Sequence, residues 1–277
     1  MSEREALIDL VDRYLDALVA NDPGRLAVTP GVRFTENGQP LELGRGLWRT
    51  ARGPKPGGQT FADPAGRQVE HWGVVSEMGR PAIVSLRLGV ADDGQIDQVE
   101  TLVVREGCRI FGPESVATSR PYDEVLDAST RLPREELVRI AGHYLDGIER
   151  GDGDMIPVVA ECVRIENGVQ TTRCAASAGA EAPWRAMGVA EQIDAGMTRH
   201  IEAARDRRFP VVDEERGLVI CHFLFDHPGN IETVNGRVPF GYPNSMMLTE
   251  LFRIREGRIH DIEAILEVFP YGMRSGW

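Results

Sequence analysis

The chain repeats itself, and this repeat restricts its fold more than any other feature. Residues 4–38 and 134–168 align without a gap. Arg-Glu opens both segments, Tyr-Leu-Asp follows at the same distance in each, and the triplet Glu-Asn-Gly closes both. Because the matches keep one order in both segments, chance is a poor explanation for them. The sequence therefore predicts two copies of one domain.

Two further pairs of segments align late in each copy. They are 99–107 with 248–257, and 83–90 with 218–225. This alignment makes Glu100 the counterpart of Glu250 and Arg87 the counterpart of His222. The length of 277 residues allows two domains of ordinary size. We therefore expect a first domain over 1–112, a proline-containing linker over 113–132, and a second domain with longer loops over 133–277.

Each copy opens with apolar residues at the spacing of an amphipathic helix. Ser2 and Glu5 predict a capping box at the start of the first helix. Residues 188–209 are expected to add a helix to the second copy, and 245–268 are expected to form a hairpin with a turn at Glu256-Gly257. The fold class is therefore α+β, with helices packed on a curved antiparallel sheet in each domain. Such a sheet leaves an apolar pocket beneath the helices.

The composition of the chain limits the kinds of molecule that it is expected to bind. The formal net charge is −12 at pH 7, which argues against a phosphate backbone as partner. No apolar run approaches the roughly 20 residues of a membrane helix, and the N-terminal residues lack the features of a signal peptide. The four cysteines form no CxxC pair, so neither a disulfide framework nor a structural zinc site is expected. We expect a cytoplasmic protein that binds neither nucleic acid nor membrane.

Three stretches carry a resemblance to a known family: "DRYLDALVANDPGRL", "VRFTENG" and "VETLVVREG". Together they resemble the cone-shaped fold of the nuclear transport factor 2-like superfamily, to which ketosteroid isomerase and the SnoaL-like polyketide cyclases belong. The resemblance spans nearly the whole chain as a tandem pair, and it implies fold more firmly than reaction.

The isomerase branch of that superfamily implies roles for several residues. It implies that Tyr14 and Tyr144 donate hydrogen bonds to an oxyanion, and that Glu100 and Glu250 are protonated second donors. The aspartate base of that branch is replaced by Asn37 and Asn167, which we expect to contact the substrate. An amide cannot abstract a proton at pH 7, so any base must lie elsewhere.

Residues 32–51 look like a group of sphingomonad-type proteins in the same superfamily. Some of these are cofactor-free lyases that remove water and formaldehyde from lignin-derived diarylpropane diols and leave a stilbene. This resemblance implies a lyase that needs no cofactor and acts on a small aromatic substrate. The other enzymes of the fold, namely isomerases, polyketide cyclases and epoxide hydrolases, remain alternatives. So does a non-catalytic ligand-binding module.

An elimination needs an acid and a base, and histidine titrates near neutral pH. We therefore expect an acid–base partner for Glu250 among the histidines, with an aromatic donor from a long loop of the second copy. Trp48 and Trp184, each followed by arginine, are expected to stack on the substrate at the mouth of the pocket. The full set of candidates is His222, His200, Tyr242, Tyr144, Tyr14, Glu100 and Glu250 for catalysis, with Trp48, Trp184, Asn37, Asn167, Arg87 and His71 for binding.

Each candidate also has a structural interpretation, as a core tyrosine, an outward-facing acid or a buried histidine. A metal site built from His200, His222 and Glu250 has no motif to support it, so no metal is expected. The chain is expected to be a monomer with an internal pseudo-dimer or a homodimer. The second copy, with its longer loops over 168–184 and 226–245, is the more promising site.

Overall fold

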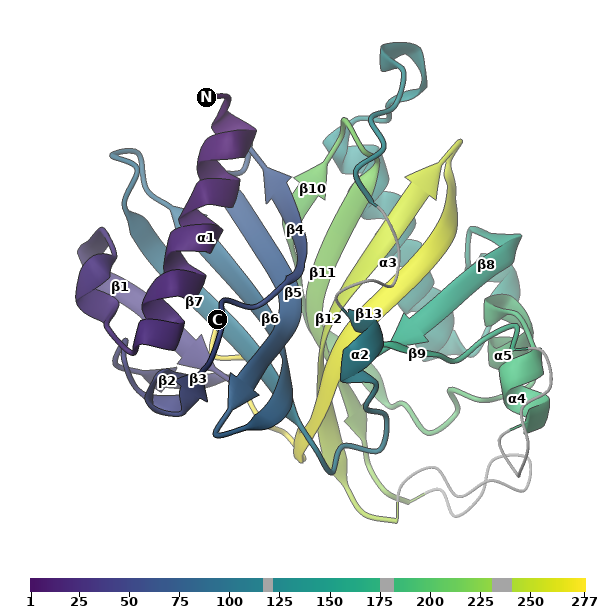
Figure 1. Cartoon of the computed structure of the whole chain (residues 1–277). Helices are drawn as coiled ribbons and strands as arrows, with labels where there is room; N and C mark the ends of the chain where they lie inside the picture. Colours follow the sequence, from purple (N-terminus) through teal and green to yellow (C-terminus); the bar gives the residue numbers. More distant parts are fainter. Residues whose placement is uncertain (117–121, 175–181, 231–240) are drawn as a thin grey trace. The chain divides into compact units, whose positions relative to one another are not determined.

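The computed structural model describes residues 1–116, 122–174, 182–230 and 241–277. The chain divides into unit 1, which is Met1–Pro121 with Arg274–Trp277, and unit 2, which is Tyr122–Met273. Each unit has its own curved sheet and its own hydrophobic core (Figure 1). The predicted class, two tandem cone-shaped α+β domains, is confirmed. The boundary between the units falls inside the predicted linker, and Arg274–Trp277 belongs to the first unit instead of the second.

Unit 1 is a long helix on a mixed sheet. Its elements are α1 (Glu3–Ala20), η1 (Pro23–Arg25), β1 (Val28–Glu36), β2 (Gln39–Leu41), η2 (Gly46–Arg49), β3 (Ala51–Arg52), β4 (Gly58–Asp63), β5 (Gln68–Glu77), β6 (Arg80–Val90), β7 (Ile96–Arg105) and α2 (Pro113–Val116). The strand order is β2-β1-β7-β6-β5-β3, with β4 also paired to β5. Only β1 and β7 run parallel in this sheet, among the residues described. Helix α1 packs against β4 and β5 (Figure 1).

Helix α1 begins and ends where its sequence predicts. The Ser2 hydroxyl accepts from the Glu5 amide, and the Glu5 carboxylate accepts from the Ser2 amide, which confirms the capping box. Asn21 ends the helix in the left-handed region, with φ of 54°. Its apolar face, which includes Tyr14 and Leu18, is buried against the sheet.

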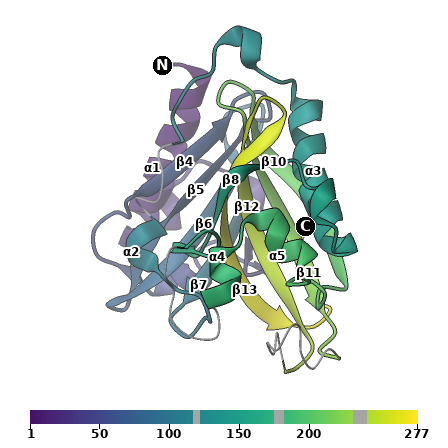
Figure 2. The ribbon, with the colours of Figure 1, turned by 90° about the vertical axis from the view of Figure 1, so that its right-hand side faces the viewer.

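Unit 2 repeats this plan. Its elements are η3 (Ala128–Thr130), α3 (Arg134–Arg150), η4 (Gly153–Met155), β8 (Val158–Glu166), β9 (Val169–Gln170), α4 (Ala182–Ala186), α5 (Val189–Asp194), β10 (Ala203–Asp213), β11 (Leu218–His227), β12 (Asn244–Arg255) and β13 (Arg258–Pro270). The strand order is β10-β11-β12-β13-β8-β9, and β8 and β13 run parallel. Helix α3 packs against β10 and β11, whereas α5 packs against β8 (Figure 2).

The repeated Asn-Gly pairs form the same turn in both units. Asn37 and Gly38 have φ of 52° and 74°, and Asn167 and Gly168 have φ of 45° and 80°. These values are typical of a two-residue type I′ hairpin loop. Each asparagine side chain also bonds to a strand beside the turn. Asn37 exchanges two hydrogen bonds, of 2.7 and 3.2 Å, with the backbone of Val103.

Asn167 exchanges the equivalent bonds, both of 2.9 Å, with the backbone of Leu266. Both ends of each amide are therefore used inside the sheet. These bonds give Asn37 and Asn167 a structural role, because their side chains hold the turn against the neighbouring strand, and their contact with substrate stays a prediction. The same bonds show that Val103 and Leu266 occupy equivalent positions, and so they align β7 with β13.

This alignment corrects the one made from sequence for the late strands. Since β7 matches β13, its neighbour β6 matches β12, and β5 matches β11. The counterpart of Glu250 is then Leu86, because Glu250 pairs with Ala264 and Leu86 pairs with Thr101. Glu100 is therefore not equivalent to Glu250.

Arg87 is likewise not equivalent to His222, since Trp72 in β5 holds the place of His222 in β11. The two Arg-Glu-Gly stretches misled the alignment because they lie at different turns. The first follows β7, whereas the second joins β12 to β13. The predicted hairpin at Glu256-Gly257 is confirmed, with φ of 51° and 75°.

The helix predicted over 188–209 is wrong for most of its length. Only α5 is helical, and the chain turns at Gly196, whose φ of 85° is left-handed. From Ala203 onward the segment forms β10, which pairs antiparallel with β11. Pairing with a buried neighbouring strand has overridden the local helical propensity of this stretch.

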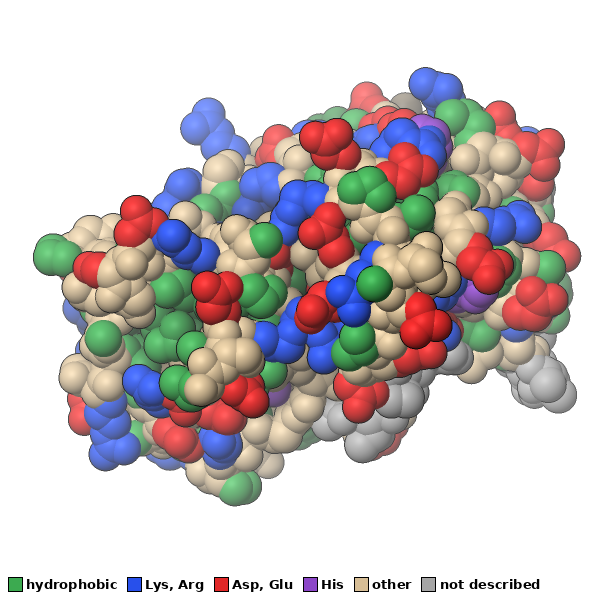
Figure 3. Space-filling model, turned by 90° about the horizontal axis from the view of Figure 1, so that it is seen from above, with side chains coloured by type: hydrophobic (Ala, Val, Ile, Leu, Met, Phe, Trp, Pro, Cys, Tyr) green, Lys and Arg blue, Asp and Glu red, His purple; other side chains and the backbone are tan. Residues whose placement is uncertain are grey.

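The surface carries both signs of charge. On the face drawn in Figure 3, acidic and basic side chains are interspersed. Among the residues described, no helix is long and apolar enough to cross a membrane.

Candidate active site

Two acidic hydroxyl groups meet in the interior of unit 2. Tyr144 lies on the buried face of α3, and Glu250 lies on β12, facing the same core. The Tyr144 hydroxyl donates to Oε1 of Glu250 over 3.3 Å, and the Tyr144 ring stands edge-on to Phe252. Glu250 is only 2% exposed, and its Oε2 has no hydrogen-bond partner in the described structure. Most buried polar atoms in folded proteins have a hydrogen-bond partner, so an unpartnered carboxyl oxygen of this kind indicates a functional role.

Arg164 brings a buried positive charge to the same place. It lies on β8, two residues before Glu166, so both side chains share one face of the strand. The guanidinium forms a 3.0 Å ion pair with Glu166, and a long 3.5 Å hydrogen bond joins it to the Tyr144 hydroxyl. Arg164 is 5% exposed. The site therefore holds a carboxylate, a guanidinium, a phenol and a second carboxyl in one connected group.

Gln192 holds the guanidinium in its orientation. Its side chain is completely buried on α5, and its Oε1 accepts from Arg164 over 2.6 Å. Its Nε2 donates to the backbone carbonyls of Thr171 and Trp184 at 2.8 and 2.7 Å. With both ends of the amide occupied, Gln192 cannot rotate without losing three hydrogen bonds. Arg164 is thereby preorganised beside Tyr144.

Burial keeps both hydroxyl groups of the site protonated at neutral pH. Desolvation raises the pKa of Glu250 to about 8, against an opposing contribution from Arg164 that lowers it, while the nearby Glu166 raises it further. Burial, followed by the proximity of Glu250, raises the pKa of Tyr144 well above its ordinary value. At pH 7 the site therefore presents a neutral carboxylic acid and a neutral phenol. It can donate protons, and Glu166 in its ion pair provides an acceptor.

The proton on Glu250 makes a pH-dependent contribution to stability. The unfolded chain releases this proton near the ordinary value of 4.5, whereas the folded chain keeps it up to about 8. Between these pH values the folded state binds more protons than the unfolded chain. The stabilisation due to the Glu250 proton is therefore complete at low pH and is lost as pH rises through 8. We expect the free energy of unfolding to fall by on the order of 2–4 kcal/mol from pH 5 to pH 8.5 through this group.

Urea unfolding of the wild type and of Glu250→Gln at several pH values measures this contribution. The difference between the two proteins should change with pH over that range, because glutamine does not titrate. Parallel curves would show that Glu250 does not carry the extra proton.

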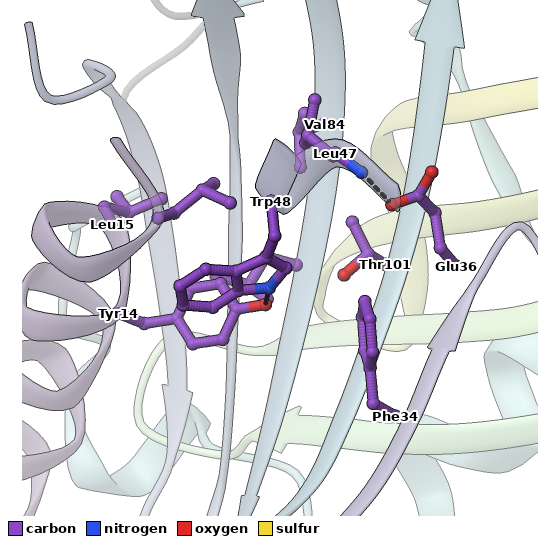
Figure 4. A pocket seen from close by; sticks show the side chains of 10 residues that line it. Tyr14, Leu15, Phe34, Glu36, Leu47, Trp48, Val84 and Thr101 are labelled. Atoms are coloured by element: carbon purple, nitrogen blue, oxygen red, sulfur yellow. Dashed lines mark hydrogen bonds between the residues drawn. The ribbon is translucent and has the colours of Figure 1, made fainter. Parts of the chain in front are cut away.

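Unit 1 has apolar side chains at two of the equivalent positions. Phe34 stands where unit 2 has Arg164, and Leu86 stands where it has Glu250. Tyr14 remains, but its hydroxyl accepts from Nε1 of Trp48 over 2.9 Å. The cavity that these side chains surround has room for about one water molecule (Figure 4).

One carboxyl group, that of Glu36, lines this cavity. Glu36, the counterpart of Glu166, accepts from the Leu47 amide over 2.7 Å, and burial raises the pKa of its carboxyl (Figure 4). A side chain at Gly46 would place its Cβ 2.3 Å from this carboxylate, so glycine is needed there. The acid of unit 1 is thus engaged by its own backbone.

The predicted histidines do not join Glu250. His222 lies between Cys221 and Phe223, which both face the core, so its side chain lies on the opposite face of β11. His200 stacks on His227 with ring centroids 5.0 Å apart, six residues along β11 from Cys221, the partner of Glu250. The His222 side chain therefore points away from Glu250, whereas the expectation that His200 is the partner of Glu250 stays a prediction.

Other predicted residues have surroundings of their own. Tyr242 is 57% exposed, ahead of β12. His71 faces the core of unit 1, where its Nδ1 meets the Thr60 hydroxyl at 2.9 Å, and burial lowers its pKa to about 4. Arg87 and Glu100 form a 2.8 Å buried ion pair with each other.

The two tryptophans are not exposed at a rim. Trp48 and Trp184 are 1% and 6% exposed, and each belongs to the interior of its own unit. The predicted loops of the second copy lie partly outside the described residues, since 175–181 and 231–240 are not described. No group of three or more metal-ligating side chains occurs in the part of the chain that is described.

Arg164, Glu166 and Gln192 were not predicted from the sequence as site residues. The first two were detectable, because charged residues spaced i, i+2 on a strand share one face. Gln192 gave no such signal, since its role depends on where α5 packs.

Comparison with known proteins gives one family match and several structural similarities. Residues 130–266 match a family described as a domain of unknown function, DUF8021. No curated protein sequence matches the chain.

Several solved structures are similar to about half of the chain. One is an NTF2-like protein from Cytophaga hutchinsonii, with 12% identity, 49% of this chain and 99% of that chain covered, and a TM-score of 0.30. Another, from Xanthomonas campestris pv. campestris, is described as a candidate polyketide cyclase, with 15% identity, 48% and 90% covered, and a TM-score of 0.34. A third, from Bacillus subtilis, is described as a candidate isomerase, with 15% identity, 48% and 87% covered, and a TM-score of 0.33.

Proposed function

We propose that unit 2 is a cofactor-independent acid–base enzyme that eliminates a hydroxyl group from a small, largely apolar substrate. The observation that carries this proposal is Glu250, a buried carboxyl that keeps its proton at neutral pH and has an unpartnered Oε2. Such an acid is suited to protonate a leaving hydroxyl. Tyr144 supplies a second donor, and Glu166, paired with Arg164, is the proton acceptor. General acid and base contributions of this kind are each worth about 10²–10⁴-fold in rate.

The substrate class that we propose is a phenolic diarylpropane-1,3-diol of the type derived from lignin. Glu250 protonates the benzylic hydroxyl, and the C–O bond breaks with loss of water. A para-hydroxyl group on the ring assists this step by releasing its proton to solvent and forming a quinone methide, and it regains a proton when the C–C bond breaks. Glu166 then removes the proton of the remaining hydroxyl, the C–C bond breaks, and formaldehyde leaves. The two-carbon bridge becomes the double bond of a stilbene, so the products are one stilbene, one water and one formaldehyde.

A panel of such diols tests this proposal. We expect stilbene absorbance and formaldehyde to appear together and in equal amounts with the wild type. The variant Glu250→Gln is the control for background chemistry, because it preserves the shape of the side chain without its acidic proton. Absence of both products from every diol in the panel would exclude the lyase.

One observation favours a second candidate, the hydrolysis of an epoxide. That reaction needs a carboxylate that activates water beside an arginine and an acid that protonates the epoxide oxygen. Glu166, Arg164 and Glu250 have these chemical properties and lie in one connected group. An aryl epoxide incubated in ¹⁸O-labelled water should then give a diol that carries one ¹⁸O atom. Binding of diols and epoxides without any product would instead favour a non-catalytic ligand-binding module.

The residues of unit 1 at the equivalent positions do not provide this acid–base chemistry. Phe34 and Leu86 replace the cation and the acid, and the remaining carboxyl of Glu36 is bound to a backbone amide. We therefore propose a single active site in each chain. Under this proposal unit 1 is retained for a purpose other than turnover.

A further inference from the structure

The segment Arg274–Trp277 lies in unit 1, although it follows the last strand of unit 2 in sequence. It contacts the outer face of the unit 1 sheet, the face that does not meet α1. Thr35 lies on this face, because its neighbour Phe34 belongs to the core. The indole Nε1 of Trp277 donates to the Thr35 hydroxyl over 2.8 Å.

Two arginines contact the indole ring. The guanidinium carbons of Arg33 and Arg87 lie 4.2 and 4.5 Å from the ring centroid, which is within the range of a cation–π interaction. Arg87 is only 2% exposed, and Glu100 holds its Nε at 2.8 Å. Gln68 and Gln98 accept from its Nη1 at 2.6 and 3.0 Å. The Arg87 face of the site is therefore held in place by the sheet itself.

The residue before the tryptophan is restricted to glycine. Gly276 has φ of 83°, in the left-handed region, and a Cβ there would lie 2.6 Å from the carbonyl oxygen of Gly38. Arg33 donates to the Gly276 carbonyl, so the same side chain contacts both residues of the pair. A hydrogen bond within the segment also orders Trp277, because its backbone amide donates to the Ser275 hydroxyl over 3.2 Å.

We propose that the outer face of the unit 1 sheet is a recognition site for a Gly-Trp segment. In the structure the chain's own Gly276-Trp277 occupies this site. The site selects tryptophan through the two guanidinium groups and the Thr35 hydroxyl, and it selects glycine through the close approach to Gly38. This gives unit 1 a binding role that does not depend on the reaction proposed for unit 2.

A complementation experiment tests this proposal. In the variant Trp277→Ala the site is emptied of its indole, and the tetrapeptide Arg-Ser-Gly-Trp is titrated into the full chain by calorimetry. We expect saturable one-to-one binding. The peptide Arg-Ser-Ala-Trp should bind at least about 10-fold more weakly, because alanine is strained at this φ and clashes with Gly38. Adding Thr35→Val to the variant should weaken binding of the first peptide by roughly 5-fold.

Equal binding of the glycine and alanine peptides, or no saturable binding at millimolar peptide, would overturn the proposal. A second measurement uses the intact chain and is independent of whether Trp277→Ala folds. We expect the indole N–H of Trp277 to exchange slowly with solvent, and Thr35→Val to speed this exchange by about 5-fold or more. The indole N–H of Trp48, bonded to Tyr14, is the internal control and should not change. Free exchange at Trp277 in the wild type would also overturn the proposal.

Discussion

Replacing Glu250 by glutamine is expected to lower turnover of the proposed substrate by about 10²–10⁴-fold, with little change in KM. Glutamine has the shape of a protonated glutamic acid and can still accept from Tyr144, but its amide cannot transfer a proton to a leaving hydroxyl. Because Glu250 is already neutral at pH 7, the substitution should leave the packing of the site intact. Steady-state kinetics on a diol that the wild type converts is the measurement.

The matched control is Glu263→Gln on the adjacent strand β13. Glu263 is also 2% exposed, but it lies on the opposite face of the sheet, where it accepts from Tyr122 over 3.0 Å. We expect this variant to keep its turnover within about 2-fold, in line with a residue that does not contact the substrate. Full activity of Glu250→Gln, or an equal loss in both variants, would remove Glu250 from the mechanism.

Replacing Arg164 by methionine is expected to cost unit 2 about 3–5 kcal/mol of stability. The substitution leaves Glu166 without its ion-pair partner and leaves the Gln192 carbonyl without a donor, both in a largely buried site. Urea unfolding followed by the fluorescence of Trp184, the one tryptophan of unit 2, reports on this loss.

Unit 1 offers the control for this prediction. Phe34 holds the place of Arg164 and lies in an apolar environment, so Phe34→Met exchanges one apolar side chain for another of similar volume. We expect it to cost less than about 1.5 kcal/mol. A similar loss in the free energy of unfolding for Arg164→Met and Phe34→Met would mean that the charge of Arg164 does not stabilise the polar residues around it.

Part of this site was accessible from the sequence. Tyr144 and Glu250 were named because of the resemblance to the isomerase branch. Both also stand out locally, Tyr144 on the apolar stripe of a helix and Glu250 as an interruption of an apolar strand. His222 met the same criterion and faces the other way, since alternation along a strand defines two faces without saying which one meets the helix. Arg164 was not among the predicted site residues. Its partners Tyr144 and Gln192 lie on α3 and α5, and only the fold brings them to β8.

The duplication, the α+β class and the turn at Glu256-Gly257 could be predicted from the sequence alone, because motif order, apolar periodicity and turn residues are local features. The correspondence of the late strands, the buried face of each strand and the presence of the polar site in unit 2 depend on tertiary contacts. Those outcomes depend on register, and a shift of one residue moves every side chain of a strand to the other face of the sheet.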